Sequence, residues 1–366
     1  MSNFLIQFVP TIIILGLLIF IHELGHFLAC RWAKVRVEKF SIGFGPEIFR
    51  RVIGETTYAI SAIPFGGFVK PAGESFAELA GSKPKAGDFI AASRIRRLII
   101  LVAGVAMNYL LAFVLLICVF WMGQQVLKPK IGGFVKGYPA EASGLKIGDN
   151  VLSLNGRPVK DWQQMTIYIM ENDQPSIVLG INRGGQNLSV EIKPQSGEGV
   201  NALGEKKQVS RIGILPSGEY SIQKFGFLDS ITHAFKTVVN ITSMTYQSLW
   251  RLATGRLSFK SLSGPIGIMM ITGNAVKMGL SALLQLTALI SISLAVINLL
   301  PIPALDGGHV FFLLIGAIFR KEVSPKIQDW VTQIGFMFLM GFMVFVVYND
   351  LVNIGAVEKV KSLFGG

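Results

Sequence analysis

The sequence predicts an α-helical polytopic membrane protein with four transmembrane spans, a membrane-associated β-loop and an inserted α+β domain. Of its 366 residues, 51% are hydrophobic and only 15% are charged, and the mean hydropathy is +0.54. Soluble domains carry about 25% charged residues, so this composition indicates an integral membrane protein. Four apolar runs are long enough to cross a bilayer, which takes about 20 residues. The net charge of +12 does not indicate nucleic-acid binding, because the basic residues form no arginine-rich stripe interleaved with aromatics.

The first span covers residues 1–30 and ends in the motif H-E-L-G-H at residues 22–26. On a helix, His22 and His26 lie one turn apart on one face, so both imidazoles can reach one metal ion. Glu23 projects beside them and could take a proton from a water at the metal. Ionisable residues inside a membrane helix are costly and usually mark a functional site. The alternative is a chance occurrence of this short pattern at a membrane boundary. A basic n-region and a small-residue cleavage site are missing, so we expect the span to be retained.

Residues 31–97 form a predicted cytoplasmic segment. Twelve Lys and Arg residues lie there against six acids, between two apolar runs, which places the segment inside by the positive-inside rule. Within it, residues 35–73 alternate apolar and small residues with Gly and Pro punctuation, which predicts short strands and turns that dip against the membrane. A strand edge of this β-loop could pair with an extended peptide. A surface hairpin packed on the helices is the open alternative.

The second span, residues 98–122, carries no charge and follows three arginines that mark its cytoplasmic end. Asn108 lies near its mid-depth. An asparagine there either joins helices by a hydrogen bond or orients a group of the functional site, and both interpretations stay open.

Residues 128–195 have the pattern of a water-exposed domain. A strand at 150–154, a turn at 155–156, a helix near 162–170 and strands at 177–181 and 188–192 follow one another. This run resembles a PDZ domain of the circularly permuted bacterial kind, on the segment P-A-E-A-S-G-L-K-I-G-D at residues 139–149. The resemblance implies binding of extended peptide ends by strand addition. A purely structural lid is the alternative.

The rest of the chain predicts two further spans. Residues 196–262 hold a linker and, at about 225–257, an amphipathic helix on the outer membrane surface. Residues 263–330 contain the third span, which ends in N-L-L-P-I-P-A-L-D-G-G-H at 298–309, and a short apolar helix. The fourth span covers residues 330–350, and residues 351–366 form a tail. Both termini and the 128–195 domain are then outside, with the histidine motif toward the cytoplasmic side.

A catalytic zinc ion takes three protein ligands and keeps one open position. His22 and His26 supply two, and the third must come from elsewhere in the chain. His233 falls on the outer-surface segment, so the candidates are Asp306 and His309, at the proline-broken end of the third span. Asp306 stands in a turn flanked by glycine, where a carboxylate can be directed into a cleft. His309 is the second candidate ligand, a partner of a ligand, or a helix-start residue.

The H-E-L-G-H motif together with N-L-L-P-I-P-A-L-D-G-G resembles the site-2 protease family of intramembrane zinc metalloproteases, in its bacterial RseP-type form with a single PDZ domain. The resemblance covers nearly the whole chain. It implies that His22, His26 and Asp306 bind one catalytic Zn²⁺, that Glu23 is the general base, and that Asn298 holds substrate or stabilises the oxyanion. It also implies that the β-loop pairs with an unwound substrate strand, which gives these substrate-binding candidates: Ile60, Ile63, Phe65, Gly66, Gly67, Phe68, Val69, Pro301 and Pro303.

The chain departs from the family pattern in the second span, where G-P-x-x-N is replaced by A-G-V-A-M-N at residues 103–108 and only Asn108 is kept. Tandem PDZ domains occur in some relatives, and here we expect one.

The resemblance implies an enzyme of the bacterial inner membrane. Its substrates would be single-span membrane proteins, including anti-sigma factors and remnant signal peptides, cleaved for regulated intramembrane proteolysis in envelope-stress or sigma-factor signalling. A rival interpretation is a non-catalytic PDZ-bearing membrane adaptor with a structural metal site, which would need four protein ligands. A small transporter is the other, and the missing inverted repeat counts against it.

Overall fold

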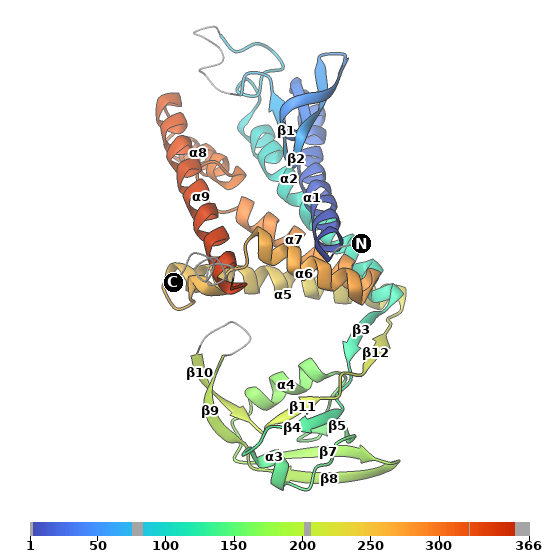
Figure 1. Ribbon diagram of the computed structural model, residues 1–366. Coiled ribbons are helices and arrows are strands. Elements are labelled where there is room, and N and C mark those ends of the chain that lie inside the picture. Colours follow the sequence, from blue (N-terminus) through green and yellow to red (C-terminus); the bar gives the residue numbers. More distant parts are fainter. Residues whose placement is uncertain (1–2, 75–82, 201–205, 322, 356–366) are drawn as a thin grey trace, which may run out of the picture. The chain divides into compact units, whose positions relative to one another are not determined.

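The computed structural model describes residues 3–74, 83–200, 206–321 and 323–355, which form two compact units (Figure 1). The first unit consists of Met1–Val119, Ser230–Tyr246 and Phe259–Gly366. The second consists of Phe120–Asp229 and Gln247–Ser258.

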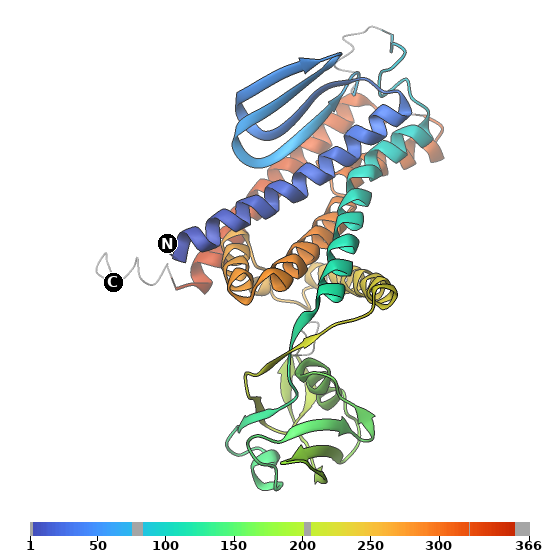
Figure 2. The same cartoon turned by 90° about the vertical axis from the view of Figure 1, so that its right-hand side faces the viewer.

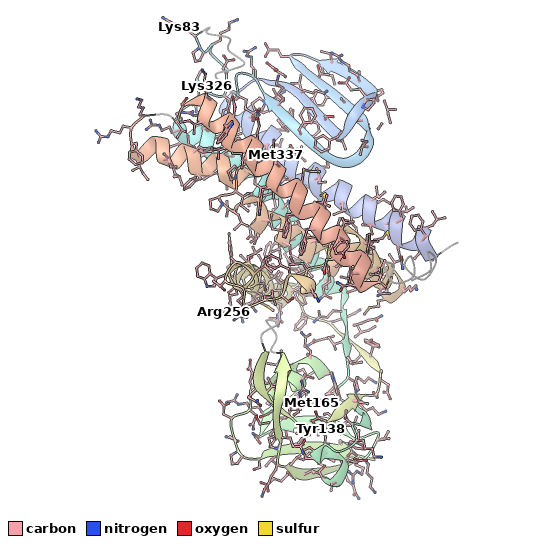
Figure 3. The ribbon with its side chains drawn as sticks, turned by 60° about the vertical axis from the view of Figure 1, so that its left-hand side comes forward. Lys83, Tyr138, Met165, Arg256, Lys326 and Met337 are labelled. Carbon is pink, nitrogen blue, oxygen red and sulfur yellow. The ribbon has the colours of Figure 1, made fainter. Side chains whose placement is uncertain are left out.

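Among the described residues, four helices are long and apolar enough to cross a membrane, as the sequence predicts. They are α1 (Asn3–Ala33), α2 (Arg94–Met122), α7 (Leu280–Asn298) and α9 (Pro325–Asn353). Large apolar side chains project outward from them, for example Met337 of α9, which is 69% exposed (Figure 3). Such side chains suit a helix whose surroundings are lipid rather than water.

Other helices in the described part of the chain lie between these four in the sequence. The amphipathic segment is α5 (Phe227–Ala253), and the short apolar helix is α8 (Asp306–Ile318). The sequence did not predict a separate helix at α6 (Pro265–Met278), which begins with a proline at its first position and ends at a glycine of positive φ. Asp350 of α9 accepts the backbone N–H groups of Gly264, Ile266 and Gly267 at 2.9–3.0 Å. This carboxylate therefore caps α6 and joins it to α9.

The β-loop forms two long strands, β1 (Val37–Ile53) and β2 (Thr56–Pro71), where the sequence predicted several short ones. Both strands bend back on themselves, and Figure 2 shows this folded hairpin beside α1. Residues 37–42 pair antiparallel with 67–71, and residues 47–53 pair with 56–61. Residues 39–42 also have 57–60 on their other side. Residues 67–71 are thus an edge of the sheet among the strands described.

The second unit is an α+β domain with its own core. Four strands form an antiparallel sheet in the order β6-β5-β7-β8, and the remaining strands pair as β3 with β12, β4 with β11 and β9 with β10. The bounds are β3 (Gln124–Leu127), β4 (Ile131–Phe134), α3 (Pro139–Ala142), β5 (Asn150–Leu154), β6 (Arg157–Pro158), α4 (Trp162–Met170), β7 (Ile177–Arg183), β8 (Gln186–Ile192), β9 (Gln195–Val200), β10 (Lys206–Arg211), β11 (Ile214–Pro216) and β12 (Tyr220–Gln223).

This unit extends beyond the boundary that the sequence suggests. Met165, which Figure 3 labels, is fully buried in its core, and Ile212 is 1% exposed in the same cluster. Strands β9 and β10 occupy a stretch expected to be linker. Polar residues and glycine obscured these strands, because the alternation that identifies a half-buried strand is weak there.

Candidate metal centre

The histidine pair lies on α1 with both rings on one face. Its ring centroids are 4.8 Å apart and the two Nε2 atoms are 3.1 Å apart. His22 is buried at 8% exposure. The Nδ1 atom of His26 lies 2.8 Å from the carbonyl oxygen of Ile100 on α2. A carbonyl only accepts, so Nδ1 of His26 carries a proton, and in the neutral ring Nε2 is left with a lone pair that can bind a metal.

Asp306 reaches the same point from α8. It stands in the first turn of that helix, after the proline-broken segment in which Ala304 has a positive φ of 77°. Its Oδ2 atom is 3.0 Å from Nε2 of His22 and 3.5 Å from Nε2 of His26. Gly307 makes this turn possible, because a Cβ there would overlap the backbone of Leu299 and Leu300.

These three ligand atoms have the spacing of a zinc site. Bonds of about 2.0–2.2 Å in tetrahedral geometry place neighbouring ligand atoms roughly 3.3–3.5 Å apart. The separations here are 3.1, 3.0 and 3.5 Å. Two imidazole nitrogens and a carboxylate are a donor set that zinc favours. The residues therefore fit a zinc ion. Among the described residues, the grouping with ligand atoms within 4.8 Å comprises His22, His26 and Asp306 and does not include His309.

Glu23 stands beside the pair and contacts the β-sheet. Its Oε2 atom accepts the backbone N–H of Val69 at 3.0 Å. Gly67 lies equally close, since a Cβ there would come within 3.3 Å of Cγ of Glu23. The edge of β2 thus runs past the carboxylate that the sequence predicts to be a general base.

The other substrate-binding candidates divide between two places. Ile60, Ile63, Gly66 and Phe68 lie in β2, as does Phe65, whose side chain is outside the described part. Pro301 is exposed and Pro303 half-buried in the segment before Asp306. A Cβ on Gly335 of α9 would meet the carbonyl carbon of Pro303 at 2.8 Å, so that helix backs the segment.

Asn298 is the last residue of α7 and is half-buried. Its side chain makes no hydrogen bond within the part of the chain described. His309 follows Asp306 by one turn of α8 and is also half-buried.

The sequence leaves the role of Asn108 on α2 open and does not identify Ile100 or Gly104 as neighbours of this centre. A Cβ on Gly104 would lie 2.8 Å from Cε1 and Nε2 of His22 and overlap Nε2 of His26. Asn108 places its side-chain Nδ2 3.3 Å from Nδ1 of His22. The signal was the spacing: residues 100, 104 and 108 fall on one face of a helix, and that face lies against the histidines.

The chain is similar in sequence to a known peptidase family and to several named proteins. The family model described as "Peptidase family M50" matches residues 10–342. A protein from Campylobacter jejuni is 34% identical over 95% of this chain and 94% of its own length. One from Clostridium acetobutylicum is 36% identical over 94% of this chain and 97% of its own, and one from Rhizobium meliloti is 31% identical over 94% and 96%. All three carry the name "Putative zinc metalloprotease".

Proposed function

The chain belongs to peptidase family M50, the site-2 protease family, and from this premise we propose that it is a zinc endopeptidase that cleaves transmembrane segments inside the bilayer. One observation carries the proposal: His22, His26 and Asp306 converge at zinc spacing with Glu23 beside them, and the two histidines and Glu23 lie on α1, a helix apolar enough to span a membrane. Ionisable residues inside a membrane-spanning helix are energetically costly, so their presence there favours a catalytic site within the bilayer.

The reaction is hydrolysis of an amide bond. When bound, a zinc ion supplies Lewis-acid polarisation of the scissile carbonyl and activates a water molecule. Glu23 accepts the proton of that water as it attacks and delivers it to the departing amine. Asn298, at the end of α7, donates its amide N–H to the developing oxyanion, a contact typically worth about 3 kcal/mol.

The edge of β2 binds the substrate as an added strand. A transmembrane helix hides its amide bonds, so it must unwind before cleavage, and its freed backbone groups need partners in lipid. Residues 67–71 form an edge that passes Glu23, so a strand paired there has its backbone next to the carboxylate. The N–H of Val69 would then donate its hydrogen bond to a substrate carbonyl instead of to Glu23.

Replacing Glu23 by Gln tests the chemistry. We expect the rate of cleavage of a single-span substrate in proteoliposomes to fall by about 10²–10⁴-fold, the usual contribution of a general base. Zinc content, measured by atomic emission, should stay at one ion per chain. Glu55→Gln, the same change in the exposed β1–β2 turn, is the control and should keep full activity. Undiminished cleavage by Glu23→Gln would contradict the proposal.

The rival function, a non-catalytic adaptor with a structural metal site, would need a fourth protein ligand. The described residues offer three, which favours catalysis. We further propose that the enzyme acts in a bacterial inner membrane, with both termini and the second unit outside and the metal centre toward the cytoplasm. Its substrates would be single-span proteins such as anti-sigma factors and remnant signal peptides, cleaved in envelope-stress signalling.

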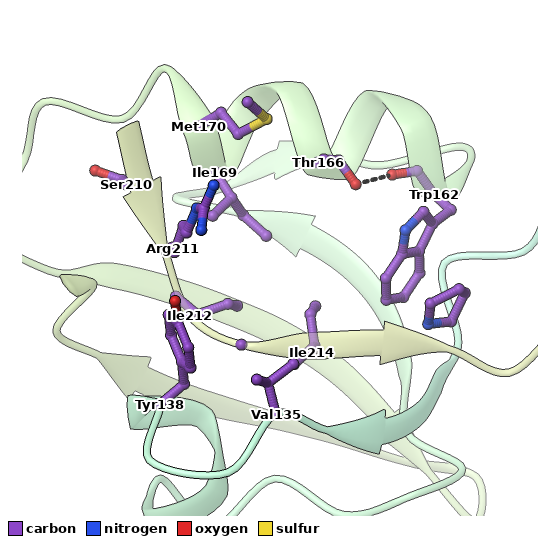
Figure 4. Close-up of a pocket in the computed structure, with 12 residues that line it drawn as sticks. Val135, Tyr138, Trp162, Thr166, Ile169, Met170, Ser210, Arg211, Ile212 and Ile214 are labelled. Carbon is purple, nitrogen blue, oxygen red and sulfur yellow. Dashed lines mark hydrogen bonds between the residues drawn. The ribbon is translucent and has the colours of Figure 1, made fainter. Parts of the chain in front are cut away.

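For the second unit we propose peptide binding of the PDZ type. A cavity of about 350 Å³ lies between α4 and the segment that leads into β11 (Figure 4). Its lining is mostly apolar and includes Trp162, Ile169, Ile212 and Ile214, and Arg211 contributes a positive charge. An apolar peptide end with a terminal carboxylate suits this lining.

Narrowing the cavity tests this binding. Thr166 lines it, with its hydroxyl bonded to the carbonyl of Trp162 at 2.9 Å. In fluorescence polarisation with the full-length protein in detergent, peptides with an apolar C-terminus should bind saturably, and Thr166→Phe should weaken binding at least about tenfold because the new ring fills the site. Gln163→Phe, on the exposed side of α4, is the matched control. Equal peptide binding by Thr166→Phe and Gln163→Phe would exclude the cavity as the binding site.

A further inference from the structure

The second span contacts both histidines of the metal centre at the ring nitrogen that faces away from Asp306. The carbonyl oxygen of Ile100 lies 2.8 Å from Nδ1 of His26. Eight residues later on α2, the side chain of Asn108 lies 3.3 Å from Nδ1 of His22. Gly104, midway between them, leaves the room that the two rings occupy. One face of α2 therefore holds both rings.

When Nε2 of a histidine binds a metal, the hydrogen-bonding role of its Nδ1 atom is fixed. An imidazole that offers the Nε2 lone pair to a metal carries its proton on Nδ1, so the partner of Nδ1 must accept a hydrogen bond. Ile100 satisfies this with a carbonyl. Asn108 can satisfy it with its amide oxygen if the amide is turned from the orientation in which Nδ2 faces Nδ1 of His22.

The amide of Asn108 has a buried oxygen that supports this assignment. Asn108 is 1% exposed, its Nδ2 faces His22, and its Oδ1 has no hydrogen-bond partner among the described residues. A half-turn of the amide exchanges the two ends and places Oδ1 against Nδ1–H of His22. The acceptor that Nδ1–H of His22 requires favours the turned orientation.

The position of Asn108 is fixed by its backbone as well. Its carbonyl oxygen accepts the hydroxyl of Ser291 on α7 at 2.8 Å, and Ser291 is fully buried. This bond joins α2 to α7 and does not involve the side chain of Asn108, which contacts His22.

We propose that Asn108 is a positioning residue that accepts the Nδ1–H of His22 and so fixes the tautomer and ring orientation in which Nε2 binds the metal. The proposal rests on the zinc site of the proposed function. Partners of this kind typically change metal affinity by 10–100-fold.

Zinc affinity of the full-length protein in detergent, measured by competition with a chromophoric chelator, tests the proposal. Asn108→Leu has nearly the same size and accepts no hydrogen bond, and we expect its zinc dissociation constant to rise about 10–100-fold. Asn108→Asp keeps an acceptor oxygen and should bind zinc within about threefold of the wild-type protein. Ser291→Ala removes the neighbouring bond but not the contact, and should leave the affinity unchanged.

The absorption of the Co²⁺-loaded protein adds a readout that does not depend on activity. Asn108→Leu should shift the d–d bands that report ligand geometry, whereas Asn108→Asp and Ser291→Ala should not. Wild-type affinity in Asn108→Leu would overturn the role of Asn108 while leaving the zinc site intact. Equal losses of zinc affinity in Asn108→Leu and Asn108→Asp would overturn it too, because the acceptor oxygen that only Asn108→Asp keeps would then make no difference. A wild-type protein that binds no zinc would overturn the proposed function together with this inference.

Discussion

Asp149 and Arg183 form a bidentate ion pair in the second unit. The two carboxylate oxygens accept Nε and Nη2 of Arg183, each at 2.7 Å, and Oδ2 also accepts the N–H of Lys146 at 2.8 Å. The Asp149 side chain is only 1% exposed. The hydrogen bonds from Arg183 hold the pKa of Asp149 below its usual value, against the opposing effect of burial.

This pair makes the second unit sensitive to acid. The pKa of Asp149 is lower in the folded than in the unfolded chain, so its stabilisation is complete above about pH 4, the unfolded value, and is lost as the pH falls through the folded value. Asp149→Asn should cost roughly 1–3 kcal/mol at neutral pH. Hydrogen exchange of β5 and β7 peptides, compared between the two proteins at each pH, should show a difference in protection that closes below pH 4. A difference in protection that stays constant down to pH 2 would contradict this prediction.

At the scale of single residues, the sequence identified most of the proposed centre. The spacing of His22 and His26 is a local property of one helix, so it could be predicted. Asp306 comes some 280 residues later, and the choice between it and His309 depended on how α8 begins. The role of the Ile100 carbonyl could not be predicted, because every residue has a carbonyl and only packing selects which one meets a histidine.

Among the elements, α2 is the one that confines the two histidine rings of the metal centre. It passes so close to α1 that Gly25 and Gly104 both lie where a Cβ would meet the other helix. Alanine is a better helix former than glycine by up to about 1 kcal/mol, so a Gly→Ala change on α2 should not weaken the helix itself. Its effect would come from the methyl group alone.

Gly104→Ala should therefore abolish zinc binding in a folded protein. The methyl group would lie among the atoms that hold the metal, and both rings would have to move. We expect atomic emission to find much less than one zinc per chain, with helix content by circular dichroism unchanged. Gly341→Ala on α9, where nothing lies within 4 Å of the added carbon, should retain full zinc content. One zinc per chain in Gly104→Ala would show that α2 does not confine the site.

The elements themselves were predicted unevenly. Long apolar helices have a strong signal, and all four expected spans are present. The β1–β2 hairpin was predicted as short strands because Gly43 and Gly45 look like chain breaks, whereas they let β1 bend without ending. Helix α6 was missed because its start depends on Asp350, a residue 85 positions away in the last span.

At the scale of the whole molecule, the proposed chemistry draws on three distant parts of the first unit. Helix α1 supplies two histidines and Glu23, α2 positions the rings, and α8 supplies Asp306. The edge of β2 adds a place for a substrate strand beside Glu23. This combination of parts is the basis for proposing that an amide bond of a membrane-spanning segment is hydrolysed at this point.

Hydrolysis in H₂¹⁸O tests this most directly. Wild-type protein in proteoliposomes is given a single-span substrate whose outer part has been removed, and the products are analysed by mass spectrometry. We predict a cut inside the apolar span, with one ¹⁸O in the new carboxylate, and no such product with Glu23→Gln. No cleavage, cuts confined to residues outside the span, or equal cleavage by Glu23→Gln would contradict an intramembrane protease.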